Sequence, residues 1–250
     1  KNIFIPSAPS DAGGSIGSAL NLYFKLHKEK KHFFQNNPFL GCEYSNENIK
    51  NEITNNIKLN DSNKFNILNL PNIELNKFVA KKIEEGNVIG WFQDRMELGP
   101  RALGNRSIIC DPRIQNLKDL LNIKIKRRES FRPFAPAILK EYMVDWFDES
   151  FDSPFMMQVT PIKKEKIKLV PAIVHIDGTC RVQTVDHLSN SKFYKLINEF
   201  YKLTSVPILL NTSFNENEPI VNEPKEAINC FLRTKLDILV LNNYIIIRKS

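Results

Sequence analysis

The sequence predicts an α/β or α+β protein built around a mixed sheet. Apolar segments of strand length alternate with longer segments of helical spacing, without a strict strand–helix–strand repeat. Of the 250 residues, 42% are hydrophobic and 25% are charged, which is ordinary for a globular protein and too apolar for global disorder. The length fits one or two domains. No stretch approaches the roughly 18 uninterrupted apolar residues of a membrane span, so no membrane partner is expected.

Each element is predicted from the local pattern of apolar residues and turn residues. Helices are expected at residues 18–28, 73–85, 114–123, 192–203 and 224–233. Strands are expected at residues 3–5, 88–92, 155–159, 173–176, 181–185, 206–210, 238–241 and 244–247. Pro224 suits the first turn of the last helix. Asn242 and Asn243 tolerate the left-handed conformations of a tight turn, so the last two strands should form a hairpin.

Composition divides the chain into three parts. Between residues 36 and 76, 13 of 41 residues are Asn and the apolar residues are isolated. This pattern predicts an Asn-rich linker at 36–77, between a terminal piece at 1–35 and a larger domain at 78–250. The chain opens with the strand-like Asn2–Ile5, without an initiator methionine or a signal-peptide pattern, and we expect it to be the back part of a longer protein.

Cysteine usage and net charge limit the classes of partner. The four cysteines lie far apart, with no C-x-x-C pair and no His at zinc-ligand spacing. We therefore expect buried, reduced cysteines in a cytoplasmic protein, without a disulfide framework or a structural metal. Lys and Arg exceed Asp and Glu by 35 to 28, and this formal charge of +7 fits nucleic acid, a membrane surface or an anionic substrate.

The segment 93–107, directly after the predicted strand 88–92, holds the densest set of chemically informative residues. It contains three arginines, two glycines and one proline within 15 residues. A loop of this composition exposes backbone N–H groups and directs guanidinium groups at one point, which suits a phosphate or a carboxylate. A surface loop with Arg–Glu ion pairs is the alternative. However, Gly99, Pro100 and Gly104 fix a backbone shape that ion pairing alone does not require.

Two further segments carry polar groups at positions suited to an anion. In residues 126–136, two prolines stiffen the chain after a cluster of Lys and Arg, and Phe131 and Phe134 can pack beneath it. Residues 211–215 come directly after the predicted strand 206–210, where α/β sheets place their ligand groups. The alternatives for these two segments are a solvated basic face and an ordinary turn.

Together these segments resemble the O-carbamoyltransferase family, whose members carbamoylate hydroxyl groups of antibiotics, nodulation factors and related sugars. The matching blocks run in order along nearly the whole chain, at residues 91–107, 111–113, 126–136, 175–185, 211–215, 219–221 and 237–240. The resemblance implies a two-lobed enzyme, with an amino-terminal lobe of the actin/hexokinase-like ATPase class and a carboxy-terminal YrdC-like lobe. The implied fold of this chain is a YrdC-like twisted mixed sheet with flanking helices, preceded by a remnant strand and helix of the first lobe.

The resemblance also implies the chemistry. In the family, the YrdC-like lobe makes carbamoyl-adenylate from carbamoyl phosphate and ATP with Mg²⁺, and the other lobe passes the carbamoyl group to a hydroxyl of a sugar or natural product. The implied catalytic residues, which would hold the phosphate, are Arg101, Lys126 and Arg132. The implied substrate- and nucleotide-binding residues are Arg106, Arg128, Arg181, Asn211 and Ser213.

Part of a metal site is implied near the start of the chain. The stretch 11–13 resembles the last nucleotide- and metal-contacting motif of the amino-terminal lobe, in which the Asp binds iron or a similar metal. Asp11 would thus be a partial site, and Fe²⁺ would belong to the complete lobe. The paired histidines that complete this site lie earlier in the family, and neither His27 nor His32 fits that role. The missing lobe is therefore an expected partner.

Two other classes of function remain open. An RNA-binding module of YrdC-like fold would use the basic surface, with Phe131 and Phe134 as stacking platforms. The prolines that alternate with these rings favour packing instead, so nucleic acid is not the expected partner. A non-catalytic fragment is the second alternative, because the acceptor site would lie in the missing lobe.

Overall fold

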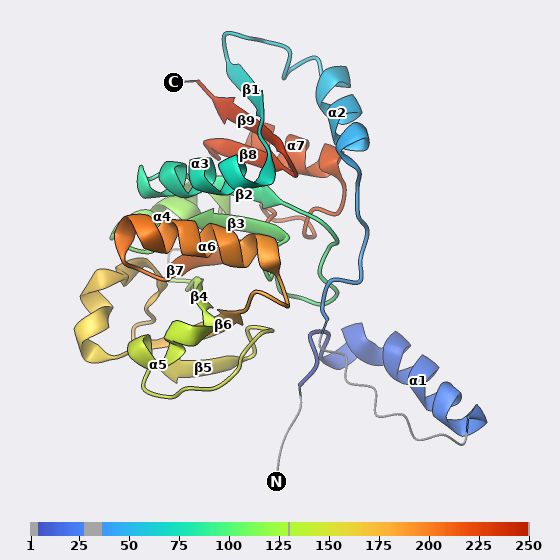
Figure 1. Cartoon of the computed structure of the whole chain (residues 1–250), viewed down its shortest axis with the longest axis vertical. Coiled ribbons are helices and arrows are strands. Elements are labelled where there is room, and N and C mark those ends of the chain that lie inside the picture. The colour runs from blue at the N-terminus through green and yellow to red at the C-terminus, as the bar shows by residue number, and fades with distance from the viewer. Residues whose placement is uncertain (1–4, 28–36, 130, 250) are drawn as a thin grey trace.

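The computed structural model of the chain describes residues 5–27, 37–129 and 131–249. Within these residues, nine strands form one mixed sheet in the order β1-β9-β8-β2-β3-β7-β4-β6-β5 (Figure 1). This sheet with its flanking helices confirms the predicted fold class. The strand expected at residues 3–5 lies outside the described residues except for Ile5.

The centre of the sheet is covered on both faces. The strands are β1 (Phe65–Asn69), β2 (Ile89–Phe92), β3 (Arg106–Cys110), β4 (Ala135–Leu139), β5 (Gln158–Pro161), β6 (Thr179–Val185), β7 (Ile208–Ser213), β8 (Ile238–Leu241) and β9 (Tyr244–Arg248). The pairs β2–β8 and β4–β6 are parallel, and the other neighbours are antiparallel. Every residue of β2, β3, β4 and β8 is buried. Their mostly continuous apolar sequences follow from this burial, because neither face meets water.

Two long helices cover one face of this sheet. The helices are α1 (Gly14–Leu26), α2 (Asn46–Asn55), α3 (Asn72–Glu84), α4 (Leu117–Leu120), α5 (Met143–Trp146), α6 (Ser191–Thr204) and α7 (Pro224–Arg233). α3 and α6 lie side by side (Figure 1), and Val79, Ile83, Phe193 and Ile197 at their inner sides are fully buried. α7 packs against β8 and β2. Helical spacing in the sequence therefore identifies the faces that build the core.

Local sequence patterns predict the carboxy-terminal elements most accurately. α7 has the predicted bounds, and β8 and β9 form the predicted hairpin, with Asn242 at a φ of 46° in its turn. The predicted strand at 173–176 is wrong. Pro171–Ile173 form a short 3-10 turn, and the N–H of His175 then bonds to the carbonyl of Thr179 across a further turn. This segment pairs with no described strand, and its buried apolar residues pack into the core from turns.

Residues 37–77, the described part of the expected linker, are instead folded onto the domain. α2 begins with a capping box between Ser45 and Asn48, and it buries Ile49 and Ile53. β1 pairs with β9 along its whole length as an edge strand of the sheet. The isolated apolar residues of this stretch are therefore spaced to meet the domain, which composition alone does not reveal.

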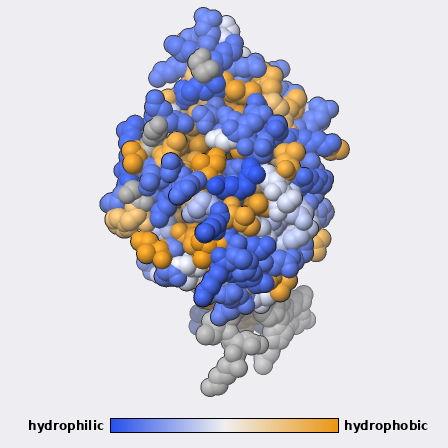
Figure 2. Space-filling model, turned by 90° about the vertical axis from the view of Figure 1, so that its left-hand side faces the viewer, coloured by the Kyte–Doolittle hydropathy of each residue, from blue (hydrophilic) through white to orange (hydrophobic). Residues whose placement is uncertain are grey.

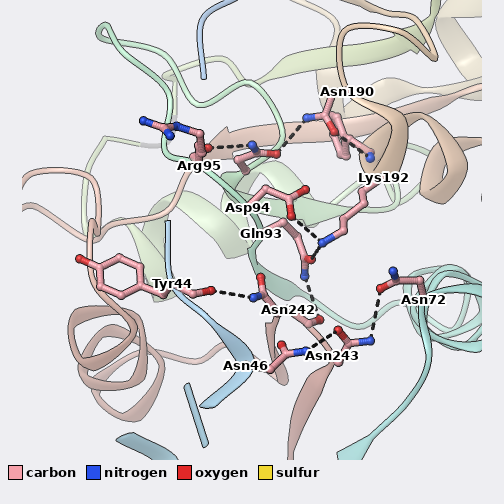
Figure 3. Close-up of polar contacts among 12 residues, drawn as sticks. Tyr44, Asn46, Asn72, Gln93, Asp94, Arg95, Asn190, Lys192, Asn242 and Asn243 are labelled. Atoms are coloured by element: carbon pink, nitrogen blue, oxygen red, sulfur yellow. Dashed lines mark hydrogen bonds and ion pairs between the residues drawn. The ribbon is translucent and has the colours of Figure 1, made fainter. Parts of the chain in front are cut away.

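Asparagine amides fasten the same segment to the turn between β8 and β9 (Figure 3). Asn242 Nδ2 donates to the carbonyl of Tyr44 at 3.0 Å. Asn243 Nδ2 also donates to the carbonyl of Leu70 at 2.7 Å. Asn46 Nδ2 donates to Asn243 Oδ1 at 3.2 Å. Several asparagines thus satisfy backbone carbonyls that would otherwise lose their hydrogen bonds on packing.

α1 projects away from the sheet (Figure 1). It packs mainly against the 3-10 turn Ser10–Gly13 that precedes it. No residue of α1 is buried, and its apolar residues Leu22, Tyr23, Phe24 and Leu26 are 40–70% exposed. The helix therefore adds nothing to the core of the sheet.

No helix in the described ranges is both long enough and apolar enough to cross a membrane. On the face seen in Figure 2, hydrophobic residues form small groups separated by hydrophilic ones. That face offers no broad apolar surface.

Candidate functional site

A cavity of about 100 Å³ lies where the predicted polar segments meet. Its lining residues are Pro100, Arg101, Ala102, Arg128, Pro133, Phe134, Ala135, Met156, Arg181, Asn211, Thr212 and Ser213. The strand order explains this meeting, because β7 lies between β3 and β4, and β6 follows β4. Segments far apart in the sequence thereby face one space. Five of the residues implied by the family resemblance line it, namely Arg101, Arg128, Arg181, Asn211 and Ser213.

Three guanidinium groups give the cavity its charge. Burial, together with the charges of Arg101 and Arg128, lowers the pKa of Arg181 to about 10. The Nε atoms of Arg101 and Arg181 are buried and have no hydrogen-bond partner among the described residues. None of the residues that line the cavity is acidic. Buried cations without counter-charges are costly, so this arrangement favours a bound anion.

Arg128 is held in place by its neighbours. Its Nε donates to Asn122 Oδ1 at 2.8 Å, and its guanidinium carbon lies 4.9 Å from the centre of the Phe134 ring. Burial lowers the pKa of Arg128, and so does the charge of Arg132. Phe134 therefore packs under the basic segment as predicted, whereas Phe131 is 67% exposed.

The loop that carries Arg101 is shaped by a buried carboxylate. Glu97 Oε1 accepts three backbone N–H bonds, from Leu103 at 2.7 Å, Asn105 at 2.8 Å and Arg106 at 3.2 Å. Gly99 has a φ of +121°, and a Cβ there would lie 2.2 Å from the carbonyl oxygen of Ser7. Only glycine fits this position, which brings the amino-terminal segment against the loop.

Arg106 supports the loop from inside and does not line the cavity. It is fully buried, and its guanidinium lies 3.6 Å from the centre of the Phe92 ring. Its Nη atoms donate to four backbone carbonyls, including those of Gln93 at 2.6 Å and Cys42 at 3.1 Å. Burial lowers its pKa to about 10, although the charge of Glu97 opposes this shift. The structure thus gives Arg106 a packing role in place of the substrate contact implied by the resemblance.

Lys126 lies behind the cavity wall. Its Nζ donates to the carbonyl of Ser213 at 2.5 Å, to the carbonyl of Asn215 at 2.9 Å and to Asn215 Oδ1 at 2.7 Å. Ser213 Oγ is 3.2 Å away. Burial lowers the pKa of Lys126 to about 7, and the charge of Arg128 acts in the same direction. Lys126 therefore ties down the end of β7, next to the anion-facing residues.

Two further predicted residues, Arg132 and Asp11, also lie outside the cavity lining. Arg132 is not among its lining residues, and its half-exposed side chain pairs with Glu129 at 3.0 Å. Asp11 is exposed in the turn before α1. In the part of the chain that the structure describes, no group of three or more His, Cys, Asp or Glu side chains could hold a metal ion.

Gln183 is a site residue that the sequence analysis does not single out. It lies on β6 two residues after Arg181, so both side chains share one face of the strand. Its Nε2 donates to the carbonyl of Leu103 at 2.8 Å, and its Oε1 accepts from Asn211 Nδ2 at 2.8 Å. The period-two spacing from Arg181 is the signal that could have identified it.

Comparison with known families identifies the chain. The family model described as "Carbamoyltransferase C-terminus" matches residues 80–248. The chain belongs to the carbamoyltransferase family. The match covers all the described residues that line the cavity, from Pro100 to Ser213.

Nodulation proteins and a cephem carbamoyltransferase are among the relatives of the chain. The nodulation protein NolO of Bradyrhizobium diazoefficiens is 40% identical over 253 residues. The match covers 98% of this chain and 44% of NolO. The nodulation protein NolNO of Sinorhizobium fredii is 39% identical over 258 residues, covering 100% of the chain and 36% of NolNO. The 3'-hydroxymethylcephem-O-carbamoyltransferase of Streptomyces clavuligerus is 28% identical over 241 residues, covering 96% and 43%. The chain spans less than half the length of these relatives.

Solved structures support the YrdC-like fold of the chain. Full-length HypF in its phosphate- and nucleotide-bound form matches 72% of the chain and 22% of HypF, with a TM-score of 0.50 and 20% identity. Sua5 of P. abyssi in complex with L-threonine matches 68% of the chain and 47% of Sua5, with a TM-score of 0.50 and 13% identity. The YrdC-like sheet expected from the resemblance is thus confirmed.

Proposed function

We propose that the cavity binds carbamoyl phosphate and the phosphate groups of ATP, and that it forms carbamoyl-adenylate for the O-carbamoylation of a hydroxyl acceptor. The observation that carries this proposal is the convergence of Arg101, Arg128 and Arg181 on one small cavity without an acidic neighbour. Two of these guanidinium groups keep a buried Nε without a partner. An anionic substrate would supply the missing acceptors.

The chemistry that we propose needs positioning and charge more than a protein nucleophile. Water releases phosphate from carbamoyl phosphate and leaves carbamate, one oxygen of which then attacks the α-phosphorus of ATP while pyrophosphate departs. Fixed guanidinium groups stabilise the negative charge that develops on the phosphoryl oxygens. Arg101 and Arg181 are placed for this role, and Lys126 keeps Ser213 in position at the wall of the cavity.

Magnesium would enter with the nucleotide. Mg²⁺ in such sites is held largely by substrate phosphates and water. The described cavity lining contains no carboxylate, so its residues fit the phosphates and offer the cation no charged ligand. Iron bound by Asp11 in a complete amino-terminal lobe remains a prediction.

The acceptor is part of the proposal as well. The Streptomyces clavuligerus relative is named for the carbamoylation of a hydroxymethyl group on a cephem. We propose an acceptor of the same class for this protein, a sugar or natural product that bears a free hydroxyl. Because the chain spans less than half of such relatives, we expect it to transfer the carbamoyl group poorly without the remainder.

Pyrophosphate release tests the proposed half-reaction. The 250-residue chain should release pyrophosphate from ATP and Mg²⁺ only when carbamoyl phosphate is present. Arg101→Met should slow this release about 30- to 1000-fold, because losing one fixed donor costs on the order of 2–4 kcal/mol. If carbamoyl phosphate does not stimulate pyrophosphate release by the unmodified chain, the proposal is contradicted. Binding to random single-stranded RNA that weakens steeply with salt would favour the nucleic-acid alternative instead.

A further inference from the structure

Two buried amides next to the cavity have their orientations set by backbone carbonyls. Gln183 is 3% exposed, and its Nε2 donates to the carbonyl oxygen of Leu103 at 2.8 Å. A carbonyl oxygen can only accept, so this bond places the NH₂ group of Gln183 toward Leu103. The opposite end of the amide, Oε1, must then face Asn211.

Gln183 Oε1 and the carbonyl of Ala102 together set the direction of the second amide. Asn211 Nδ2 donates to Gln183 Oε1 at 2.8 Å and to the carbonyl of Ala102 at 3.1 Å. Both of its N–H groups are thereby used. Asn211 Oδ1 is buried and has no partner among the described residues, and Asn211 lines the cavity. A buried acceptor without a donor is costly, so the site lacks one hydrogen-bond donor.

We infer that Gln183 is a positioning residue that, together with the carbonyl of Ala102, holds Asn211 so that it offers an acceptor, and that this acceptor selects an anion bearing an –NH₂ group. The inference rests on the proposed function, since the carbamoyl group is such a donor beside a phosphate. An acetyl group has nearly the same shape but carries CH₃, which leaves Asn211 Oδ1 unpaired. A carboxylate or carbonate oxygen at that position is repelled. The hydrogen bond from the ligand –NH₂ group to Asn211 Oδ1 therefore selects the carbamoyl group, while the arginines bind the phosphate.

A matched pair of stable probes separates these two contributions. Phosphonoacetamide and acetonylphosphonate differ only in an NH₂ in place of a CH₃. The unmodified chain should bind the amide about tenfold more tightly than the ketone in calorimetry, because an unsatisfied buried acceptor costs on the order of 1–3 kcal/mol and 1.4 kcal/mol is tenfold. Inorganic phosphate, which tests only the cationic part of the site, should also bind.

Variants test the role of Gln183. In Gln183→Met one N–H of Asn211 loses its partner and only the carbonyl of Ala102 still holds the amide. The amide is then less firmly oriented, so the preference should fall to about threefold or less. Gln93→Met is the matched control, because Gln93 is equally buried and donates to the carbonyl of Asn242 at 3.1 Å without lining the cavity. It should keep the full preference. Asn211→Leu should abolish the preference for the amide over the ketone. This second variant tests the role of the Asn211 acceptor if Gln183→Met does not fold.

The outcomes distinguish the inference from the proposed function. Equal binding of both probes by the unmodified chain would overturn the selection by Asn211 and leave the anion site standing. An undiminished preference in Gln183→Met would remove Gln183 as the positioning residue. If neither probe nor inorganic phosphate binds, the proposed function itself fails.

Discussion

Two basic regions of the molecule differ in how their cations are paired. The larger is a groove of about 630 Å³ beside α7. Its lining residues are Ile57, Lys58, Asp61, Lys64, Phe65, Asn229, Leu232, Arg233 and Arg248. There Lys64 pairs with Asp61 at 3.1 Å, Arg233 pairs with Glu216 at 3.0 Å and also with Glu218, and Arg248 donates to backbone carbonyls.

In the smaller cavity, by contrast, the buried Nε atoms of Arg101 and Arg181 have no partner among the residues that the structure describes. The groove has more cations and more volume, but its charges are largely neutralised or solvated. The cavity is small and lacks any acidic lining residue. The pairing and burial of cations therefore mark a ligand site better than their number does.

The largest change in substrate affinity is expected when an arginine of the cavity is replaced. Arg181→Met should weaken the binding of carbamoyl phosphate about 30- to 1000-fold, since removing a buried charge partner costs on the order of 2–4 kcal/mol. Arg233→Met, in the groove, should change the affinity less than about twofold. Isothermal titration calorimetry measures both. Equal losses in the two variants would mean that both regions attract the substrate through net charge alone.

The pH dependence of stability tests Lys126, the buried cation behind the cavity wall. Burial lowers its pKa to about 7 from the 10.5 of an unfolded chain, so between these values the unfolded chain binds more protons. The free energy of unfolding should therefore rise from pH 7 to pH 9, by up to about 1.4 kcal/mol per pH unit from this group. Below pH 7 its contribution is constant, because both states are protonated.

Denaturant titrations across this pH range should show a flatter curve for Lys126→Met than for the unmodified chain. Parallel curves would mean that the four surrounding oxygens keep Lys126 protonated in the folded state.

A smaller effect is expected at Arg132. Its side chain pairs with Glu129 on the surface, and exposed pairs of this kind contribute less than about 1 kcal/mol. Arg132→Ala should therefore change carbamoyl phosphate affinity less than about threefold. A loss as large as that of Arg181→Met would instead support the phosphate contact that the resemblance implies.

The smallest change in affinity is expected for the lysines at residues 163–166, which do not line the cavity. The triple replacement of Lys163, Lys164 and Lys166 by Ala should leave anion affinity unchanged. The Nζ of Lys166 lies 4.9 Å from the centre of the Trp146 ring, so the variant should lose about 0.5–1 kcal/mol of stability. Thermal unfolding measures that loss. A clear fall in affinity would mean that long-range charge steers the substrate.

Local patterns were sufficient where neighbouring residues decide the structure. The capping residues and apolar spacing of α7 are adjacent in sequence, and so are the two asparagines of the β8–β9 turn. The Asn-rich segment was misjudged because its order comes from contacts with β9 and with the turn at Asn243, more than 170 residues away. Composition carries no information about such partners.

The sequence by itself determined the mixed-sheet class, the family, and the segments from which the cavity is built. Only the tertiary structure divided the arginines of those segments among three roles. Arg101 and Arg181 face the cavity, Arg106 bonds to carbonyls under the loop, and Arg132 pairs on the surface. The physical reason is that a guanidinium acts according to what surrounds it. Its surroundings depend on strand order and on chain segments far away in sequence, which a local motif does not contain.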